Sequence, residues 1–217
     1  MNLADYQSRY KERTDVGPGW EAIDLALEGI YGGQKPEHWG TLVKGFLGGP
    51  DPIDGISMYR SSAGGREHRH FCSYGFSNLY YDEEAFGKEF SRWGFELTFR
   101  LAESNVGMHD PVWVCNVMQN LGRYVFQSEK WFEEFHWIPA NGPICLDSDT
   151  SLVGLAFVRD SEVPPLDTPH GRVELLQMVG ITGNELDAIR GKQRTCADVI
   201  EHLRVGNPLL ITDLARQ

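Results

Sequence analysis

Two histidines near the middle of the chain are the first candidates for chemistry. His68 and His70 flank Arg69, and on a β-strand two residues at this spacing lie on one face. Two imidazoles on one face can hold a metal ion, but a structural zinc site usually has four ligands, and the sequence shows no partner cluster. We therefore interpret the pair as part of a polar strand edge, and we predict neither a metal nor another cofactor.

His136 is the second candidate, because it lies close to Glu133 and Glu134 and could act with them in acid/base catalysis. No nucleophile accompanies it, and the chain has no GxSxG elbow, no HExxH helix and no phosphate-binding glycine loop. We interpret the surrounding aromatic residues as packing on the core, and we predict a protein that is not an enzyme. A hydrolase that uses His68, His70 or His136 is the alternative. The aromatic residues of this segment are Trp131, Phe132, Phe135 and Trp137.

A stretch rich in aromatic residues indicates protein binding. Between positions 71 and 81 the chain has five aromatic residues, and Asp82 begins an acidic group. Alternation along a strand would place Phe71 on one face and both Tyr74 and Phe76 on the other, so some of these side chains belong to the core. Aromatic rings anchor interfaces, and a neighbouring carboxylate can select the partner's charge. The candidate partner-binding residues are Phe71, Tyr74, Tyr80 and Asp82.

Helix signals recur along the chain. Each of four segments combines a capping residue or a proline with apolar residues three and four positions apart, which is the pattern of a helix that packs on a core. The first segment runs from Pro18 to the pair Gly32-Gly33, and the second from Asp110 and Pro111 to Val125 and beyond. The third begins at Thr182 and the fourth at Thr195, each of which starts a capping box.

Strands are predicted from β-branched, aromatic and alternating residues. They fall at 55–60, 71–77, 95–101, 152–158, 173–181 and 209–212, and the predicted loops at 61–69, 141–150 and 161–170. The order of the elements predicts a mixed α/β (α+β) fold with a central mixed sheet and helices packed on its faces. We expect a single domain over 1–217, with an N-terminal helical region over 1–40.

The net charge is strongly negative. The chain has 20 Lys and Arg against 31 Asp and Glu, which gives −11. This charge repels nucleic acid and favours a basic partner, although it can equally serve only to keep the protein in solution. The sequence has no membrane-spanning stretch and no secretion signal, so we expect a cytoplasmic protein. Its cysteines are then expected to be free, buried thiols; they are Cys72, Cys115, Cys145 and Cys196.

Several blocks of the sequence resemble a known family, in the family's order. The blocks are Leu47–Arg60, Phe71–Tyr80, Trp93–Leu101, Gln119–Glu129, Thr168–Gly171, Leu176–Ile181, Glu185-Leu186 and Leu210–Asp213. Together they resemble the N-terminal domain of the Suppressor of fused family over residues 41–213.

The resemblance implies a protein that binds other proteins. In the two-domain animal members, both domains clamp an extended peptide of a Gli-type transcription factor beside the region that matches Phe71 to Asp82. Phe71 falls where the family has a tyrosine, and Tyr80 and Asp82 fall on its Leu-Tyr-x-Asp pattern. The binding mode would be strand addition, in which backbone hydrogen bonds supply affinity and side chains supply selectivity.

The length of the chain indicates which members of the family it resembles, and through them the class of partner. It stops at Gln217, just after the first domain, and a short single-domain chain resembles the bacterial members, some of which are proposed to be immunity proteins that neutralise toxins. We therefore expect a non-enzymatic interaction protein, with a basic toxin domain as its partner. A regulator that binds a transcription-factor peptide is the alternative, and the oligomeric state stays open.

Overall fold

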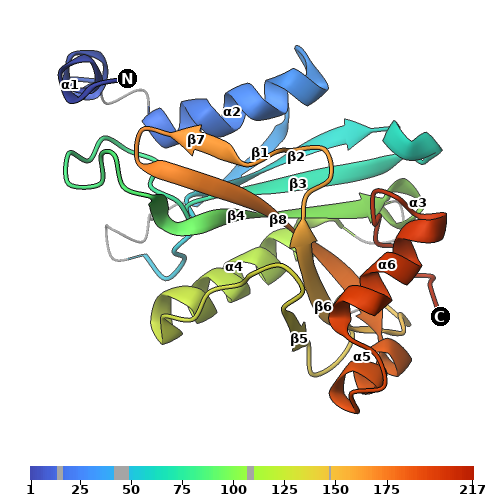
Figure 1. Cartoon of the computed structure of the whole chain (residues 1–217). Coiled ribbons are helices and arrows are strands. Elements are labelled where there is room, and N and C mark those ends of the chain that lie inside the picture. Colours follow the sequence, from blue (N-terminus) through green and yellow to red (C-terminus); the bar gives the residue numbers. More distant parts are fainter. Residues whose placement is uncertain (14–16, 42–48, 107–109, 147) are drawn as a thin grey trace.

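A single mixed β-sheet crosses the molecule, and helices cover both of its faces (Figure 1). The computed structural model describes residues 1–13, 17–41, 49–106, 110–146 and 148–217. Among the described strands the order is β1-β2-β3-β4-β8-β6-β5, with β7 paired to the start of β8, and β4 and β8 pair in parallel while the other neighbours are antiparallel. The strands are β1 (Glu37–Gly40), β2 (Gly55–Ser61), β3 (His68–Tyr74), β4 (Phe90–Ala102), β5 (Trp137–Pro139), β6 (Leu152–Arg159), β7 (Leu166–Thr168) and β8 (Gly171–Thr182).

The helices begin where the sequence supplies caps. The hydroxyls of Thr182 and Thr195 each accept a hydrogen bond from the backbone N–H three residues later, and Glu185 and Asp198 complete the two boxes, so both predicted capping boxes are confirmed. The helices are α1 (Leu3–Tyr10), α2 (Pro18–Tyr31), α3 (Glu103–Val106), α4 (Val112–Ser128), α5 (Gly183–Arg190) and α6 (Cys196–Gly206).

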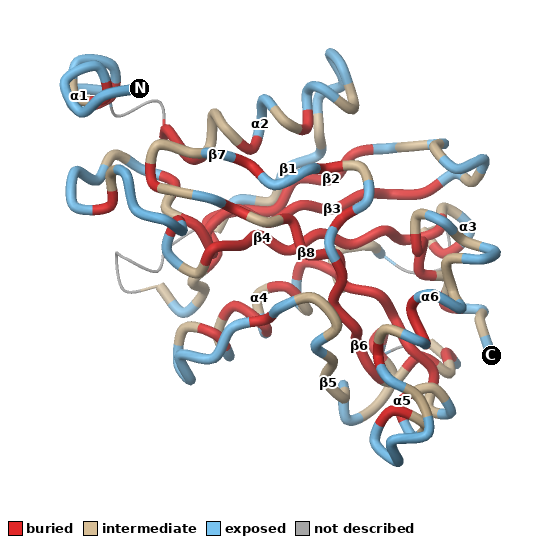
Figure 2. Tube along the Cα trace, in the orientation of Figure 1, coloured by how far each residue is buried: buried red, intermediate tan, exposed pale blue. Residues whose placement is uncertain are grey.

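Alternation along β8 divides the hydrophobic core into layers. Leu176 and Met178 belong to the cluster under α4, whereas Leu175 belongs to the cluster under α2 and Val179 to the cluster under α5 and α6. Because successive side chains point to opposite faces, α4 covers one face, and α2 and the α5–α6 pair cover opposite ends of the other. The central strands are accordingly buried along most of their length, while each helix keeps an exposed side (Figure 2).

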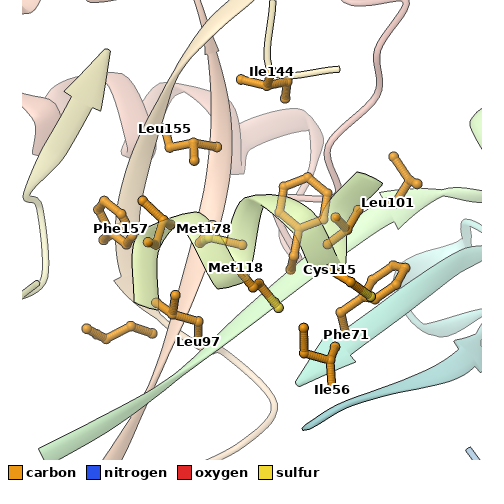
Figure 3. Close-up of a cluster of buried hydrophobic side chains, with 14 of the residues drawn as sticks. Ile56, Phe71, Leu97, Leu101, Cys115, Met118, Ile144, Leu155, Phe157 and Met178 are labelled. Carbon is orange, nitrogen blue, oxygen red and sulfur yellow. The ribbon is translucent and has the colours of Figure 1, made fainter. Parts of the chain in front are cut away.

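The face under α4 is closely packed and apolar (Figure 3). Met118 of α4 lies against the sheet among Leu97, Phe157 and Met178. Phe132, which follows α4, stacks on Phe157 with their ring centroids 4.1 Å apart. Burying a side chain of this size contributes about 2 kcal/mol, so this layer supplies a large share of the driving force for folding.

The opposite face has a different composition, because polar residues separate its two apolar clusters. At one end Tyr74 of β3 stacks on Trp20 of α2 with their centroids 4.2 Å apart, and its hydroxyl donates to Asp24 at 2.8 Å. At the other end α5 and α6 pack on β6 and β8. Arg100 and Gln177, both buried, lie between the two clusters. This face therefore requires polar partners inside the core.

The predicted fold class is confirmed, because the structure is a single domain with a mixed sheet and helices on both faces. The four predicted helices are α2, α4, α5 and α6. α4 begins at Val112, so Pro111 precedes it, and the Asp110 carboxylate accepts a hydrogen bond from the Val112 N–H at 3.0 Å.

Several predicted strand limits are wrong. The strand predicted at 71–77 is β3, which begins at His68 and ends at Tyr74, so the predicted loop 61–69 is shorter than expected. The strand predicted at 209–212 is a single bridge between Thr212 and Leu101, and β7 lies within the predicted loop 161–170. β1, β5 and β7 are too short to show an alternating pattern. Leu47 and Gly48, which begin the first resemblance block, lie outside the described residues.

Candidate partner-binding site

Two of the four predicted partner-binding residues lie in the core. Phe71 and Tyr74 each have 0% of their surface exposed. Phe71 belongs to the cluster under α4, and Tyr74 belongs to the cluster under α2 on the other face. Neither side chain offers surface to a partner in this conformation. Both instead hold β3 between the two layers of helices.

The predicted alternation fails at Gly75. Strict alternation places Tyr74 and Phe76 on one face, but Phe76 packs under α4, with its ring centroid 4.8 Å from that of Phe95. Gly75 has φ +141°, which residues with a side chain rarely adopt, and a Cβ there would lie 2.9 Å from the backbone nitrogen of Asp54. The glycine therefore turns the chain out of the sheet, and residues 77–82 form a loop.

Tyr80 and Asp82, the other two predicted residues, are exposed on this loop. Tyr80 is 36% exposed, and its hydroxyl donates to the carboxylate of Asp54. Both residues line a groove of about 630 Å³ together with residues of the turn 49–54, the start of β4 and the last turns of α4. The turn 49–54, which contains Pro50 and Pro52, thus meets the aromatic stretch at one groove although the two are distant in sequence.

The groove carries charges of both signs. Asp54 and Asp82 line it, and so do Arg92 and Arg123. Arg123 pairs with Asp51, and the Arg92 guanidinium lies 4.4 Å from the centre of the Phe126 ring. These groups can bind charged and hydrogen-bonding side chains of a partner.

A buried carboxylate fixes the base of the loop. Glu96 of β4 accepts hydrogen bonds from the Ser73 hydroxyl (2.6 Å), the Gly75 N–H (2.9 Å), and both the N–H (2.9 Å) and the hydroxyl (2.7 Å) of Ser77. Burial raises the pKa of Glu96, and these hydrogen bonds oppose that increase. Sequence reasoning missed Glu96, because one glutamate in an apolar strand gives no sign of the donors that β3 and the residues after it supply.

The histidines of β3 are buried and do not form a polar strand edge. His68 and His70 share one face, as predicted, but β3 lies between β2 and β4, and each histidine is only 1% exposed. His70 uses both ring nitrogens: Nδ1 lies 2.6 Å from the Tyr31 hydroxyl, and Nε2 lies 3.1 Å from Asp160 Oδ2. The correction has a simple cause, because α2 and the segment after β6 cover this face.

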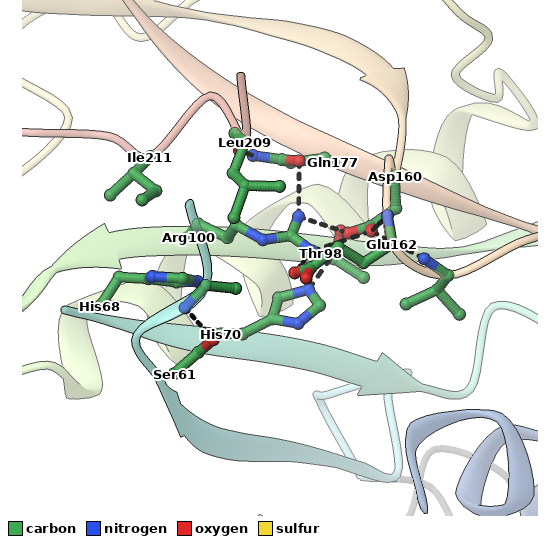
Figure 4. A network of polar contacts seen from close by, with 12 residues as sticks. Ser61, His68, His70, Thr98, Arg100, Asp160, Glu162, Gln177, Leu209 and Ile211 are labelled. Carbon is green, nitrogen blue, oxygen red and sulfur yellow. Dashed lines mark hydrogen bonds and ion pairs between the residues drawn. The ribbon is translucent and has the colours of Figure 1, made fainter. Parts of the chain in front are cut away.

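His70 belongs to a network centred on one ion pair (Figure 4). Arg100 donates two hydrogen bonds to Asp160, at 2.7 and 2.9 Å, and further ones to Gln177 (2.6 Å) and Glu162 (2.9 Å). Burial alone would raise the pKa of Asp160, but His70 and Arg100 outweigh it and hold this pKa well below its usual value. Among the described residues no group of three or more His, Cys, Asp and Glu is arranged to hold a metal ion.

The segment around His136 agrees only in part with its interpretation. Phe132 is buried on the core as predicted, whereas Trp131 is 53% exposed. The His136 side chain is also exposed, and its Nδ1 accepts a hydrogen bond from the Glu133 N–H at 3.2 Å. The histidine therefore shapes an irregular surface segment that follows α4.

The remaining sequence predictions concern cysteines and membranes. All four cysteines are buried thiols outside any disulfide, as predicted. Across the part of the chain that the structure describes, we find no helix with the length and apolar character that a membrane span requires.

Comparison with known proteins identifies relatives along most of the chain. A sequence model described as Suppressor of fused protein (SUFU) matches residues 49–217. The human and mouse proteins named Suppressor of fused homolog are each 37% identical over 213 residues, which cover 91% of this chain and 43% of the relative. The chain thus spans less than half the length of these curated relatives.

Solved structures share the fold. A chain from the crystal structure of a Sufu–Fu complex is 32% identical, with a TM-score of 0.85 over 94% of this chain and 92% of that one. Drosophila Suppressor of Fused is also 32% identical, with a TM-score of 0.83 over 93% of this chain and 51% of that one. A homologue from Neisseria gonorrhoeae, 9% identical, has a TM-score of 0.61 over 91% and 94% of the two chains, which bears on the fold alone.

Proposed function

The chain belongs to the Suppressor of fused family, and we propose from this that it is a non-enzymatic domain that binds a protein partner at the groove beside Tyr80 and Asp82. The observation that carries the proposal is the geometry of this groove: an exposed tyrosine and an exposed carboxylate stand together on a loop with a rigid base. Tyrosine and charged groups of this kind are typical anchors of an interface. A related chain was crystallised in a complex with Fu, which supports protein binding as the kind of function.

The charge of the protein favours a basic partner. With a net charge of −11, the chain attracts a positively charged surface over long range and accelerates the encounter with it. We propose a basic toxin domain as this partner. The chain would then be a cytoplasmic immunity protein that acts by covering the toxin.

An extended peptide is the second candidate partner. The groove is bordered by irregular backbone at 77–82, and it combines an aromatic ring with charges of both signs, which suits the backbone and side chains of an extended segment. In that case the chain would act as a regulator that binds a peptide of a transcription factor.

Affinity capture from the native lysate tests the groove. The bait is the wild-type protein or the double variant Tyr80→Ala, Asp82→Arg. The matched control is Tyr124→Ala, Glu133→Arg, which removes a tyrosine that is 44% exposed, against 36% for Tyr80, and makes the same change of charge on another surface. Circular dichroism confirms that each bait is folded.

We expect the wild type and the control to retain a basic protein. The groove variant should retain at least tenfold less of it. The control separates contact at the groove from the weaker long-range attraction that any loss of negative charge produces. Equal retention by all three baits would move the binding site elsewhere. Capture of no protein by any folded bait would refute the interaction function itself.

A further inference from the structure

The loop that presents Tyr80 and Asp82 is held by two residues that are distant in sequence. Tyr6 of α1 and His170 of the β7–β8 turn are both completely buried. The Asp82 N–H donates to the Tyr6 hydroxyl oxygen at 2.9 Å, and this oxygen lies 2.7 Å from His170 Nε2. His170 Nδ1 lies 3.0 Å from the carbonyl oxygen of Asn78. These bonds form a relay that begins and ends on the same loop.

The chemistry of the partners assigns each proton in the relay. The Asn78 carbonyl can only accept, so His170 donates from Nδ1, and a neutral imidazole then accepts at Nε2. The Tyr6 hydroxyl therefore donates its proton to Nε2, and its oxygen is free to accept from the Asp82 N–H. Burial lowers the pKa of His170, which favours the neutral ring that this arrangement needs. Every donor thus meets an acceptor.

Further contacts hold α1 against the loop and the residues that follow it. The Tyr6 ring stacks on Tyr81, with centroids 5.0 Å apart, and lies 4.8 Å from the Phe86 ring. Lys11, just after α1, pairs with Glu83 at 3.3 Å. α1 lies outside the residues 49–217 that the family model matches, yet its buried side chain meets the backbone of the candidate site.

We infer that Tyr6 and His170 are positioning residues of the partner-binding groove, which hold residues 78–82 in the conformation that presents Tyr80 and Asp82. The inference rests on the proposed function of that groove. A loop that is ordered before binding loses less conformational entropy when the partner arrives. Loss of the relay should therefore weaken binding although no group that faces the partner is removed.

Amide hydrogen exchange tests the positioning role without any partner. Tyr6→Phe removes one hydroxyl and keeps the stacked ring. Its matched control is Tyr10→Phe in the same helix, whose hydroxyl donates to Glu21 of α2 at 2.6 Å. We expect the Asp82 amide to exchange about five- to tenfold faster in Tyr6→Phe, because it loses its acceptor. Tyr10→Phe should leave that amide unchanged.

Two further readouts separate positioning from a general loss of stability. Amides of β4 and β8 should keep their wild-type exchange rates in Tyr6→Phe. In the double variant Tyr6→Phe, His170→Gln, the free energy of exchange of the Asp82 amide should fall by less than the sum of the two single effects, because both substitutions act through one relay. A uniform increase across the protein, or an equal effect of Tyr10→Phe, would overturn the inference.

Binding measurements link the relay to the groove. A partner whose retention requires Tyr80 and Asp82 should dissociate from Tyr6→Phe about three- to tenfold faster than from the wild type. Wild-type dissociation from Tyr6→Phe would refute the positioning role while the proposed function stands. A partner retained by the Tyr80→Ala, Asp82→Arg variant would refute the proposed site instead, and the exchange data would still decide whether the relay orders the loop.

Discussion

Replacing Asp160 by asparagine tests whether the polar residues inside the core act as one ion-pair network. The substitution preserves the size of the side chain and removes the negative charge that faces Arg100. Both side chains of the pair are 0% exposed, so water cannot take over the role of the lost charge. Asp160→Asn therefore leaves a buried guanidinium with an incomplete set of partners.

The expected loss of stability follows from what Arg100 retains. Removal of one partner of a buried ion pair costs about 3–5 kcal/mol. Arg100 still donates to Gln177 at 2.6 Å and to Glu162 at 2.9 Å, and the Glu162 side chain is 21% exposed. Because Glu162 still provides a negative charge, we expect a loss near the lower limit, about 3 kcal/mol, and a fall in Tm of about 6–12 °C.

Urea denaturation followed by tryptophan fluorescence and circular dichroism measures this loss. Glu201→Gln is the control, because it breaks an exposed pair with Arg204 and should change the free energy of unfolding by less than about 0.5 kcal/mol. The double variant Arg100→Met, Asp160→Asn should be at least about 1 kcal/mol more stable than the sum of its single effects, since no buried charge is left alone. A loss below about 1 kcal/mol for Asp160→Asn, or strict additivity, would refute the network.

Two further predictions concern the supports of the loop. A Cβ on Gly19 of α2 would lie 2.1 Å from the Asn78 carbonyl oxygen, whereas Gly29 on the same helix has open space around it. Gly19→Ala should therefore lower the free energy of unfolding by about 1–3 kcal/mol, and Gly29→Ala should raise it by up to about 1 kcal/mol. Equal effects of the two substitutions in thermal unfolding would contradict the close contact. Burial holds the pKa of His170 below its usual 6.5, so its contribution to stability is present above pH 6.5 and is lost as the pH falls through the folded-state pKa. His170→Gln should reduce the fall in the free energy of unfolding between about pH 7.5 and 5.5 by up to about 1.4 kcal/mol per pH unit, and a fall as steep as that of the wild type would contradict this.

Local patterns predicted the helices best. Thr182 with Glu185, and Thr195 with Asp198, form the expected capping boxes, because a cap depends on residues within one turn of each other. The short strands at the ends of the sheet escaped prediction for the opposite reason, since they are defined by pairing with a neighbour and not by their own pattern.

The candidate site was predictable only as a stretch of sequence. The aromatic and acidic residues between Phe71 and Asp82 indicated binding, and alternation placed Phe71 and Tyr74 on opposite faces of the strand. Nothing in the pattern showed that both of these faces are buried while Tyr80 is exposed. A strand covered on both faces has apolar residues at successive positions, so alternation cannot separate core from surface. The positive φ of Gly75 ends the strand, after which Phe76 packs under α4 and the chain continues as the loop that carries Tyr80.

By itself the sequence determined the family, the capped helices, the class of the sheet and the negative charge, since each of these depends on residue types or on neighbours along the chain. Only the tertiary structure decided which residues meet across it. The parallel pairing of β4 with β8 brings the strand that carries Arg100 beside the one that carries Gln177, and the docking of α1 brings Tyr6 to His170, 164 residues away. Such partners are set by the order of strands in the sheet and by the burial of polar groups that must be satisfied there, and no local periodicity encodes that order.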